Sequence, residues 1–167
     1  IIESNFKFYN NLKDTMNKMK KNQQIFHKTG GTHAAAIFDE NGKLILLRED
    51  IVRHNTVDKV IGAAKRQSLD IGVIALSGRV GWEIVAKCVR TNVPIILAVG
   101  AISSSAEILA RKSGMTLVGF AASPNPSVIG ESKKLACLPS LTNASENLVV
   151  SVDNFLSSIL ITSTGIF

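Results

Sequence analysis

Short apolar runs that alternate with amphipathic segments constrain this sequence more than any other feature. Residues 72–76, 94–99 and 115–120 are near-continuous aliphatic runs, and residues 80–91 and 104–113 between them have helical patterning. Strands that are buried on both faces have this unbroken apolar character. Strands and helices joined in this order by short links predict right-handed crossovers within one parallel sheet.

An antiparallel hairpin is expected ahead of these parallel units. Residues 33–38 and 43–47 have strand character, and they flank a turn with Asn41-Gly42, the pair that two-residue hairpin turns favour. Together with the parallel units, this hairpin predicts an α/β fold with a mixed sheet and helices on both faces, in three α/β/α layers. Two further helices are expected at residues 6–27 and 55–66.

The composition is that of one domain with an aliphatic core. The chain has 167 residues, of which 46% are hydrophobic and only 5% aromatic, and this length is enough for one packed core. Residues 122–167 are richer in Ser, Asn and Thr, so we expect an α/β domain over residues 1–121 followed by a divergent tail. Within that tail, residues 147–161 are apolar enough to pack as a strand or a helix.

The charge is basic and unevenly distributed. The formal net charge is +6, and residues 1–28 hold six lysines against Glu3 and Asp14. Such an excess favours an anionic partner, although the lysines can equally form a solvated helix face. General binding of nucleic acid is the weakest of these interpretations, because no aromatic platform accompanies the lysines.

The cysteine content indicates a reducing compartment. Cys88 and Cys137 lie far apart, and neither has the spacing of a structural zinc site. No apolar run reaches the length of a membrane span and the start of the chain lacks a signal-peptide layout. We therefore expect a cytoplasmic protein that makes no contact with a membrane.

Two loops are placed to bind a ligand. In open α/β sheets, ligands bind beyond the carboxyl ends of the strands, and Ser77-Gly78-Arg79 and residues 100–105 occupy such positions. Small residues at a helix start suit an anion, and Arg79 can add paired hydrogen bonds. Plain helix capping is the alternative, since Ser104 and Glu107 have the spacing of a capping box.

The segment from Arg48 to Val60 concentrates charge between a strand and a helix. Unpaired charges do not enter a core without a large desolvation cost, so this segment is expected at a rim, where it pairs internally or binds a ligand. Asn55 can cap the following helix and Asp58 suits its first turn. Arg53 and His54 have no such structural explanation, which makes them candidate ligand contacts.

Three motifs in this order and spacing resemble a known family. They are T-G-G-x-H-A-A-A from Thr29, R-E-D-x-x-R-H-N-x-x-D-K from Arg48, and S-G-R from Ser77. The segment 22–121 that contains them resembles the C-terminal domain of the formate dehydrogenase accessory protein family (FdhD).

This resemblance implies a function and a set of partners. Family members are sulfur carriers that take sulfur from a cysteine desulfurase and deliver it to bis-guanylyl molybdopterin before this cofactor enters formate dehydrogenase. The resemblance also implies a homodimer and a cytidine-deaminase-like domain that binds the molybdenum cofactor or GDP. The positions that it implies for this site are Thr29, Gly30, Gly31, His33, Arg48, Arg53, His54, Asn55, Asp58, Lys59, Ser77, Gly78 and Arg79.

Several residues depart from these patterns. A deaminase needs a zinc-binding His and Cys set with a catalytic Glu, but Ala35 follows His33-Ala34 and Ser77-Gly78-Arg79 stands where a cysteine pair is needed, so no zinc is expected. Val52 stands where the family usually has glycine.

The family's cysteine pair upstream of the T-G-G block has no counterpart among the first 28 residues. Persulfide chemistry requires a thiolate, and Cys137, near Lys133 and Lys134, is the candidate. Cys88 is expected to be packed. The alternative function is a cofactor- or nucleotide-binding module without transfer chemistry.

Overall fold

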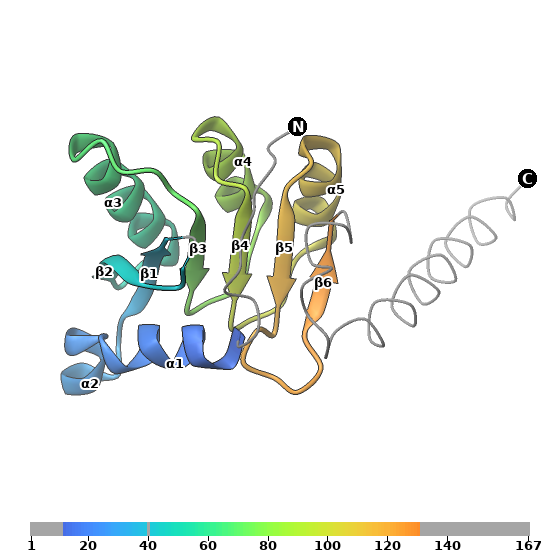
Figure 1. Cartoon of the computed structure of the whole chain (residues 1–167). Coiled ribbons are helices and arrows are strands. Elements are labelled where there is room, and N and C mark those ends of the chain that lie inside the picture. Colours follow the sequence, from blue (N-terminus) through green and yellow to red (C-terminus); the bar gives the residue numbers. More distant parts are fainter. Residues whose placement is uncertain (1–11, 40, 131–167) are drawn as a thin grey trace, which may run out of the picture.

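A computed structural model describes residues 12–39 and 41–130 of the chain. A six-stranded mixed sheet has the strand order β2-β1-β3-β4-β5-β6 and is seen in Figure 1. The central strands β3 to β5 are parallel, and both β1 and β6 run antiparallel to their neighbours. The elements are α1 (Leu12–Lys21), α2 (Gln24–Thr29), β1 (His33–Phe38), β2 (Leu44–Asp50), α3 (Arg53–Arg66), β3 (Val73–Leu76), α4 (Trp82–Arg90), β4 (Ile95–Ala98), α5 (Ser104–Ser113), β5 (Thr116–Gly119) and β6 (Ser127–Ile129).

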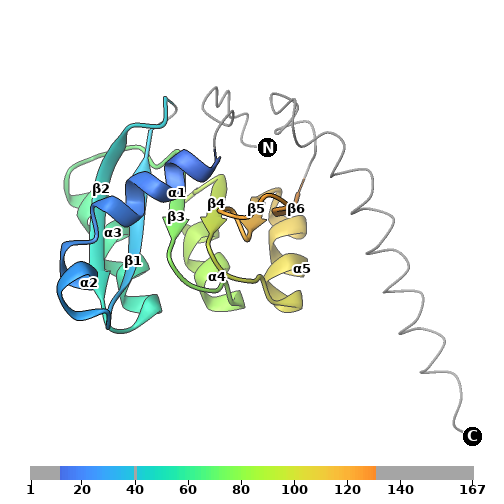
Figure 2. The same cartoon turned by 90° about the horizontal axis from the view of Figure 1, so that it is seen from below.

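Helices cover both faces of the sheet, which confirms the predicted α/β class. Figure 2 shows α1 on one side of the strands and α4 and α5 on the other. The similarity to cytidine deaminases stays a prediction. Within the described residues, no helix is both long and apolar enough to cross a membrane.

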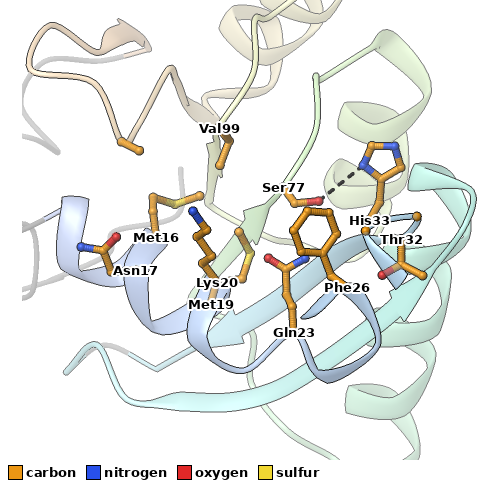
Figure 3. Close-up of a pocket in the computed structure, with 13 residues that line it drawn as sticks. Met16, Asn17, Met19, Lys20, Gln23, Phe26, Thr32, His33, Ser77 and Val99 are labelled. Carbon is orange, nitrogen blue, oxygen red and sulfur yellow. Dashed lines mark hydrogen bonds between the residues drawn. The ribbon is translucent and has the colours of Figure 1, made fainter. Parts of the chain in front are cut away.

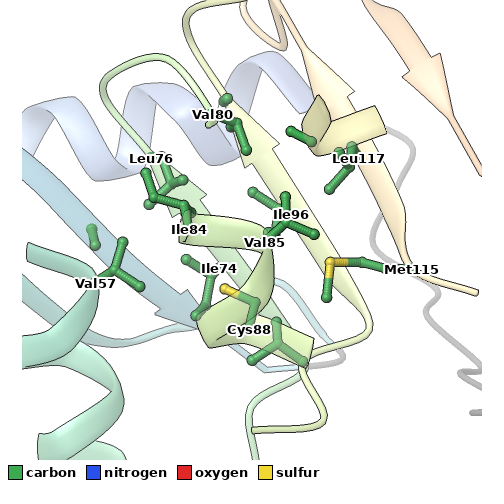
Figure 4. Packing of buried hydrophobic residues seen from close by; sticks show 14 of the residues in the cluster. Val57, Ile74, Leu76, Val80, Ile84, Val85, Cys88, Ile96, Met115 and Leu117 are labelled. Atoms are coloured by element: carbon green, nitrogen blue, oxygen red, sulfur yellow. The ribbon is translucent and has the colours of Figure 1, made fainter. Parts of the chain in front are cut away.

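The alternation of side chains along the strands divides the core into two clusters. On one face, Ile74 and Ile96 pack against α4 residues such as Ile84 and Cys88 (Figure 4). On the other face, Phe38 packs against Met16 and Met19 of α1, in a cluster that also contains Ala75 and Leu97. Aliphatic side chains dominate both clusters, as the composition predicts.

The predicted helix at 6–27 is wrong as one continuous element, because α1 ends at Lys21 and α2 begins at Gln24. Gln23 has φ −79° and ψ 78°, which is not helical. The side-chain carboxylate of Glu49, from β2, accepts hydrogen bonds from the N–H groups of Ile25 and Phe26 at 2.8 Å. These N–H groups are therefore satisfied by a distant strand rather than by a continuing helix. Residues 6–11 lie outside the described part of the chain.

The hairpin is confirmed, but β2 is longer than the predicted 43–47. Gly42 has φ 74° in the turn, and Asp39 Oδ1 accepts hydrogen bonds from the N–H groups of Asn41 and Lys43 at 2.9 Å. The return strand continues through Asp50, which pairs with His33 of β1. The first three residues of the charged segment therefore belong to a strand.

Helix starts differ from the predictions at two places. The N-cap of α3 is Val52, so the helix begins two residues before Asn55, and neither the predicted cap at Asn55 nor the first-turn position of Asp58 is correct. In α5 the N-cap is Ser103, whose Oγ accepts a hydrogen bond from Ala106 N–H at 3.3 Å. The capping box predicted at Ser104 and Glu107 is therefore wrong.

Strand β6 lies within the predicted tail. It pairs with β5, with Val128 opposite Val118, so this part of residues 122–167 packs on the sheet. The segment predicted to pack at residues 147–161 lies outside the described residues, and the division into two segments at residue 121 stays a prediction.

Candidate functional site

A cavity of about 480 Å³ opens at the carboxyl ends of the central strands. Helix α1 crosses the sheet near the arrowheads of β3 and β4 in Figure 1. Together with α2 it forms one wall, with Met16, Met19 and Phe26 as the apolar residues. Val99, just after β4, and Ser77, just after β3, contribute from the sheet side (Figure 3).

The T-G-G block forms the rim of this cavity, where Gly30, Gly31, Thr32 and His33 all line it. Gly30 ends α2 with φ 66°, a conformation that glycine adopts without a steric penalty, and its N–H donates to Phe26 O. Thr29 has a structural role instead, because its Oγ1 donates to Ile25 O at 2.9 Å and accepts from Gly31 N–H at 3.2 Å.

His33, Ser77, Gly78 and Arg53 come together beside the cavity. Ser77 Oγ accepts a hydrogen bond from Ala34 N–H at 2.8 Å and lies 3.5 Å from His33 Nδ1. A Cβ placed on Gly78 would lie 3.3 Å from His33 Nδ1 and 3.7 Å from Arg53 Cδ. The absence of a side chain at Gly78 therefore allows the imidazole and the arginine to approach each other across the loop.

Arg79, in the loop after β3, packs against Gly100 in the loop after β4. A Cβ on Gly100 would be 2.9 Å from Arg79 Cγ and 3.0 Å from its backbone nitrogen. The two loops are joined by backbone hydrogen bonds, with Gly100 N–H donating to Gly78 O at 3.2 Å and Val80 N–H to Ala101 O at 2.9 Å. The side chain of Arg79 is exposed at this edge of the sheet.

The positive charge of this group is not compensated within the described residues. Neither Arg53 nor Arg79 makes an ion pair or a side-chain hydrogen bond there, and the Nε atom of Arg53 is buried without a partner. Helices α3 and α4 both start at this edge, and no side chain caps either start; the first turn of α4 contains one carboxylate, Glu83, and that of α3 contains none. Free helix N-termini carry partial positive charge and attract anions.

His54 follows Arg53 in the first turn of α3 and faces Glu83 of α4. Its Nε2 atom is buried and lies 3.9 Å from Glu83 Oε2, a distance too long for a hydrogen bond. Glu83 is largely exposed in the first turn of α4. This carboxylate faces the His54 ring, so His54 is only partly available to a ligand.

The remaining predicted residues form ion pairs or hydrogen bonds on the outer side of the sheet. Lys59 Nζ lies 2.5 Å from Asp50 Oδ2 and 3.2 Å from Glu49 O. Asn55 Nδ2 donates to Asp50 Oδ1 at 3.2 Å. Hydrogen bonding by Lys59 is the main reason that the pKa of Asp50 falls to about 2. These residues hold β2 against α3.

Arg48 and Asp58 lie on this outer side too. Asp58 Oδ2 accepts from Lys87 Nζ at 2.6 Å, and Arg48 Nη1 donates to Leu47 O at 2.7 Å. With Lys59 they line an open groove beside β2 rather than the cavity at the strand ends. The structure therefore places Arg53, His33, Ser77, Gly78 and Arg79 in one group and separates Arg48, Asn55, Asp58 and Lys59 from it.

The sequence analysis did not identify Gln23 and Phe26, which line the cavity, or Glu49, which holds α2 in place. Glu49 holds α2 through Ile25 and Phe26, and its Oε1 also accepts from Thr32 Oγ1 at 3.0 Å. Gln23 and Phe26 line the cavity from α2 and the turn before it. The R-E-D motif contained Glu49, but no local pattern connects it to residues that precede it by more than twenty positions.

Of the two cysteines, Cys88 lies within the described residues. Cys88 is fully buried in α4, and burial raises the pKa of its thiol to about 12, so it carries no thiolate at neutral pH. The packing expected for Cys88 is confirmed. Cys137, the proposed reactive cysteine, lies outside the described residues. Among residues 12–39 and 41–130, no group of His, Cys, Asp and Glu side chains could hold a metal ion.

Comparison with known proteins identifies one family. A family model described as FdhD/NarQ matches residues 5–136. A curated relative from Sulfolobus acidocaldarius, named "Sulfur carrier protein FdhD", is 45% identical over 106 residues, which cover 62% of this chain and 42% of the relative. The protein of the same name from Streptomyces coelicolor is 44% identical over 112 residues, 65% of this chain and 40% of the relative. The chain thus spans about two fifths of the length of these relatives.

A solved structure is similar as well. The crystal structure of a protein from Desulfotalea psychrophila, described as a formate dehydrogenase accessory protein, superposes with a TM-score of 0.68 at 27% sequence identity. The superposition covers 75% of this chain and 55% of that chain.

Proposed function

Because the chain belongs to the FdhD/NarQ family, we propose that it serves the maturation of formate dehydrogenase by binding a guanylyl molybdenum cofactor. The ligand is bis-guanylyl molybdopterin, for which GDP is a simpler substitute. The chain takes part in sulfur transfer to this cofactor together with a cysteine desulfurase, and it acts as a homodimer. The names of its relatives, as sulfur carriers and a formate dehydrogenase accessory protein, support this assignment.

The observation that carries the proposal is the uncompensated positive charge beside the cavity. Arg53 and Arg79 have no carboxylate partner among the described residues, and they stand where α3 and α4 begin without side-chain caps. A pyrophosphate offers the negative charge and the acceptor oxygens that arginines and free helix amides bind. The adjoining apolar wall, with Met16, Met19 and Phe26, suits the ring systems of the same ligand.

His33 and Ser77 lie between the positive group and the apolar wall. Both line the cavity, and Gly78 brings the His33 ring close to Arg53. A hydroxyl and an imidazole at this junction can donate hydrogen bonds to phosphate or ribose oxygens. We therefore assign the phosphates to the side of Arg53 and Arg79 and the rings to the side of α1 and α2.

A titration of GDP tests the binding site. We expect Arg53→Ala to weaken GDP binding by at least tenfold, because a charge-assisted contact to phosphate is lost. The control is Arg66→Ala, at the other end of α3 and about 20 Å away along a helix that rises 1.5 Å per residue. Equal affinities of the wild type and Arg53→Ala would remove the proposed site.

Sulfur transfer depends on a reactive thiol, and Cys88 is unsuited to that role because its pKa is raised to about 12. We propose Cys137 as the residue that carries the persulfide. Incubation of the chain with a cysteine desulfurase and cysteine, followed by mass spectrometry, should show an added sulfur atom on the peptide with Cys137. Sulfur on neither cysteine would favour the second candidate function, a cofactor-binding module without transfer chemistry, which the burial of Cys88 also supports.

A further inference from the structure

Gln23 is a buried polar residue whose side chain makes no capping hydrogen bond to α2. Its exposed fraction is 4%, and it lines the cavity. Its side-chain amide has no hydrogen-bond partner among residues 12–39 and 41–130. The amide atoms of Gln23 are not among the buried side-chain atoms that lack a partner, so they are open to the cavity that Gln23 lines and are available to a ligand there.

Two hydrogen bonds hold the backbone of Gln23 at the wall of the cavity. Gln23 N–H donates to Lys20 O at 3.3 Å, and Gln23 O accepts from His27 N–H at 3.1 Å. Gln23 is also the N-cap residue of α2, yet its side chain makes no capping hydrogen bond. The carboxylate of Glu49 takes the N–H groups of Ile25 and Phe26 instead. Glu49 thus fills the role that an N-cap side chain usually has and leaves the Gln23 amide free.

The surroundings of this amide suit a flat ring. Phe26, which follows Gln23 by three residues, lines the same cavity, as do Met16 and Met19 (Figure 3). An aromatic face and thioether side chains pack well against planar rings. An amide next to them offers one acceptor and two donors, which match the edge of a nitrogen heterocycle. A phosphate would find Lys20 as the one charged group on this wall, whereas Arg53 and Arg79 both lie on the other side.

We propose that Gln23 is a specificity-determining residue that hydrogen-bonds the edge of a nitrogen heterocycle, while Phe26 supports the face of its ring. This assignment rests on the proposed binding of a guanylyl cofactor and adds the part of the site that distinguishes the ring from the phosphates. The ring then lies against α1 and α2, and the charged groups of the ligand extend past His33 toward Arg53.

Binding of GDP and of inorganic pyrophosphate by the full chain tests this assignment. Calorimetric titration of Gln23→Leu should show GDP affinity five- to tenfold lower than the wild type, the usual effect of losing one neutral hydrogen bond. Pyrophosphate affinity should stay unchanged, because its contacts lie elsewhere. The matched control is Gln24→Leu, which replaces the adjacent, exposed glutamine that does not line this cavity.

Thermal unfolding of the same variants separates recognition from a structural role. If the amide held the fold together, Gln23→Leu would be less stable. An amide that makes no hydrogen bond within the fold leaves the stability nearly unchanged when an apolar group of similar size replaces it. We expect the latter. A lower melting temperature for Gln23→Leu, with GDP and pyrophosphate affinities reduced together, would overturn the inference.

Two further outcomes identify which proposal has failed. If the wild type binds GDP no more tightly than pyrophosphate, or if Gln23→Leu binds GDP as the wild type does, ring recognition by Gln23 is wrong and the anion site stands. If the wild type binds neither compound, the proposed function fails and the role of Gln23 fails with it.

Discussion

The carboxylate of Glu49 accepts a hydrogen bond from the backbone N–H of Phe26 at 2.8 Å, which joins β2 to the helix that walls the cavity. The same carboxylate accepts from Ile25 N–H and Thr32 Oγ1. Burial raises the pKa of Glu49, but these hydrogen bonds to the ionised form outweigh it and hold the pKa below the ordinary value of 4.5. One acidic side chain thus fixes both the start of α2 and the T-G-G rim.

Replacement of Glu49 by glutamine should destabilise the protein. Glu49→Gln keeps one acceptor oxygen but loses the charge that three donors share, so we expect a loss of about 1.5 kcal/mol in the free energy of unfolding. Urea denaturation measures this loss. The control is Glu107→Gln, which removes an exposed carboxylate paired only with Arg111 within α5 and should cost at most about 0.5 kcal/mol.

Acid should weaken the contact between β2 and α3. The folded pKa of Asp50, about 2, lies below its ordinary value of 3.8, so the folded state binds this proton less readily than the unfolded state. The resulting stabilisation is present above about pH 4 and is lost as the pH falls toward 2. Urea unfolding between pH 2 and pH 5 should show a weaker pH dependence for Asp50→Asn than for the wild type. Identical pH profiles would contradict this role of the Lys59–Asp50 pair.

Cys88 should be unreactive in the folded protein. In a Cys137→Ala variant Cys88 is the remaining cysteine, and its burial and its raised pKa of about 12 leave almost no accessible thiolate at pH 8. Iodoacetamide should therefore fail to alkylate the native variant within an hour, yet alkylate it fully in guanidinium. Mass spectrometry reports the modification, and rapid native alkylation would show that α4 opens readily.

Alanine at position 100 should disturb the loops that carry Arg79. The added Cβ would lie 2.9 Å from Arg79 Cγ and 3.1 Å from its Cα, so a backbone must shift. We expect Gly100→Ala to destabilise the protein by about 1–3 kcal/mol, the usual range for overpacking. It should also weaken GDP binding, because Arg79 is displaced. Unchanged stability and unchanged affinity together would contradict this geometry.

Alanine at position 62 should have the opposite effect on stability. Gly62 lies inside α3, and a Cβ there would meet only Arg66 Nη1 at 3.7 Å, an ordinary contact. Gly62→Ala should therefore stabilise the protein by about 0.5–1 kcal/mol, because glycine loses more backbone entropy than alanine in a helix. Thermal unfolding measures this gain, and GDP binding should not change.

Most of the strands and helices could be predicted from the local pattern of apolar and polar residues. The apolar runs around Ile74, Ile96 and Leu117 predicted the parallel strands, and α5 has the predicted bounds of 104–113. Such patterns are local because the repeat of a strand or helix follows from backbone geometry, and burial selects matching side chains. The helix N-caps were misplaced only locally, by three residues at Val52 and by one at Ser103. The break before α2 was missed because it depends on Glu49, more than twenty positions away.

The motifs were sufficient to indicate a family, but not to divide their residues by role. Arg53 and Lys59 belong to one charged segment, yet Arg53 faces the loops after β3 and Lys59 pairs with Asp50 on the outer side of the sheet. Whether a charged side chain is paired depends on which strand and helix ends lie next to each other in the folded protein. The spacing of residues along the chain does not predict these tertiary contacts. The same holds for Gln23, whose amide is free only because a carboxylate from another strand has taken over the capping of α2.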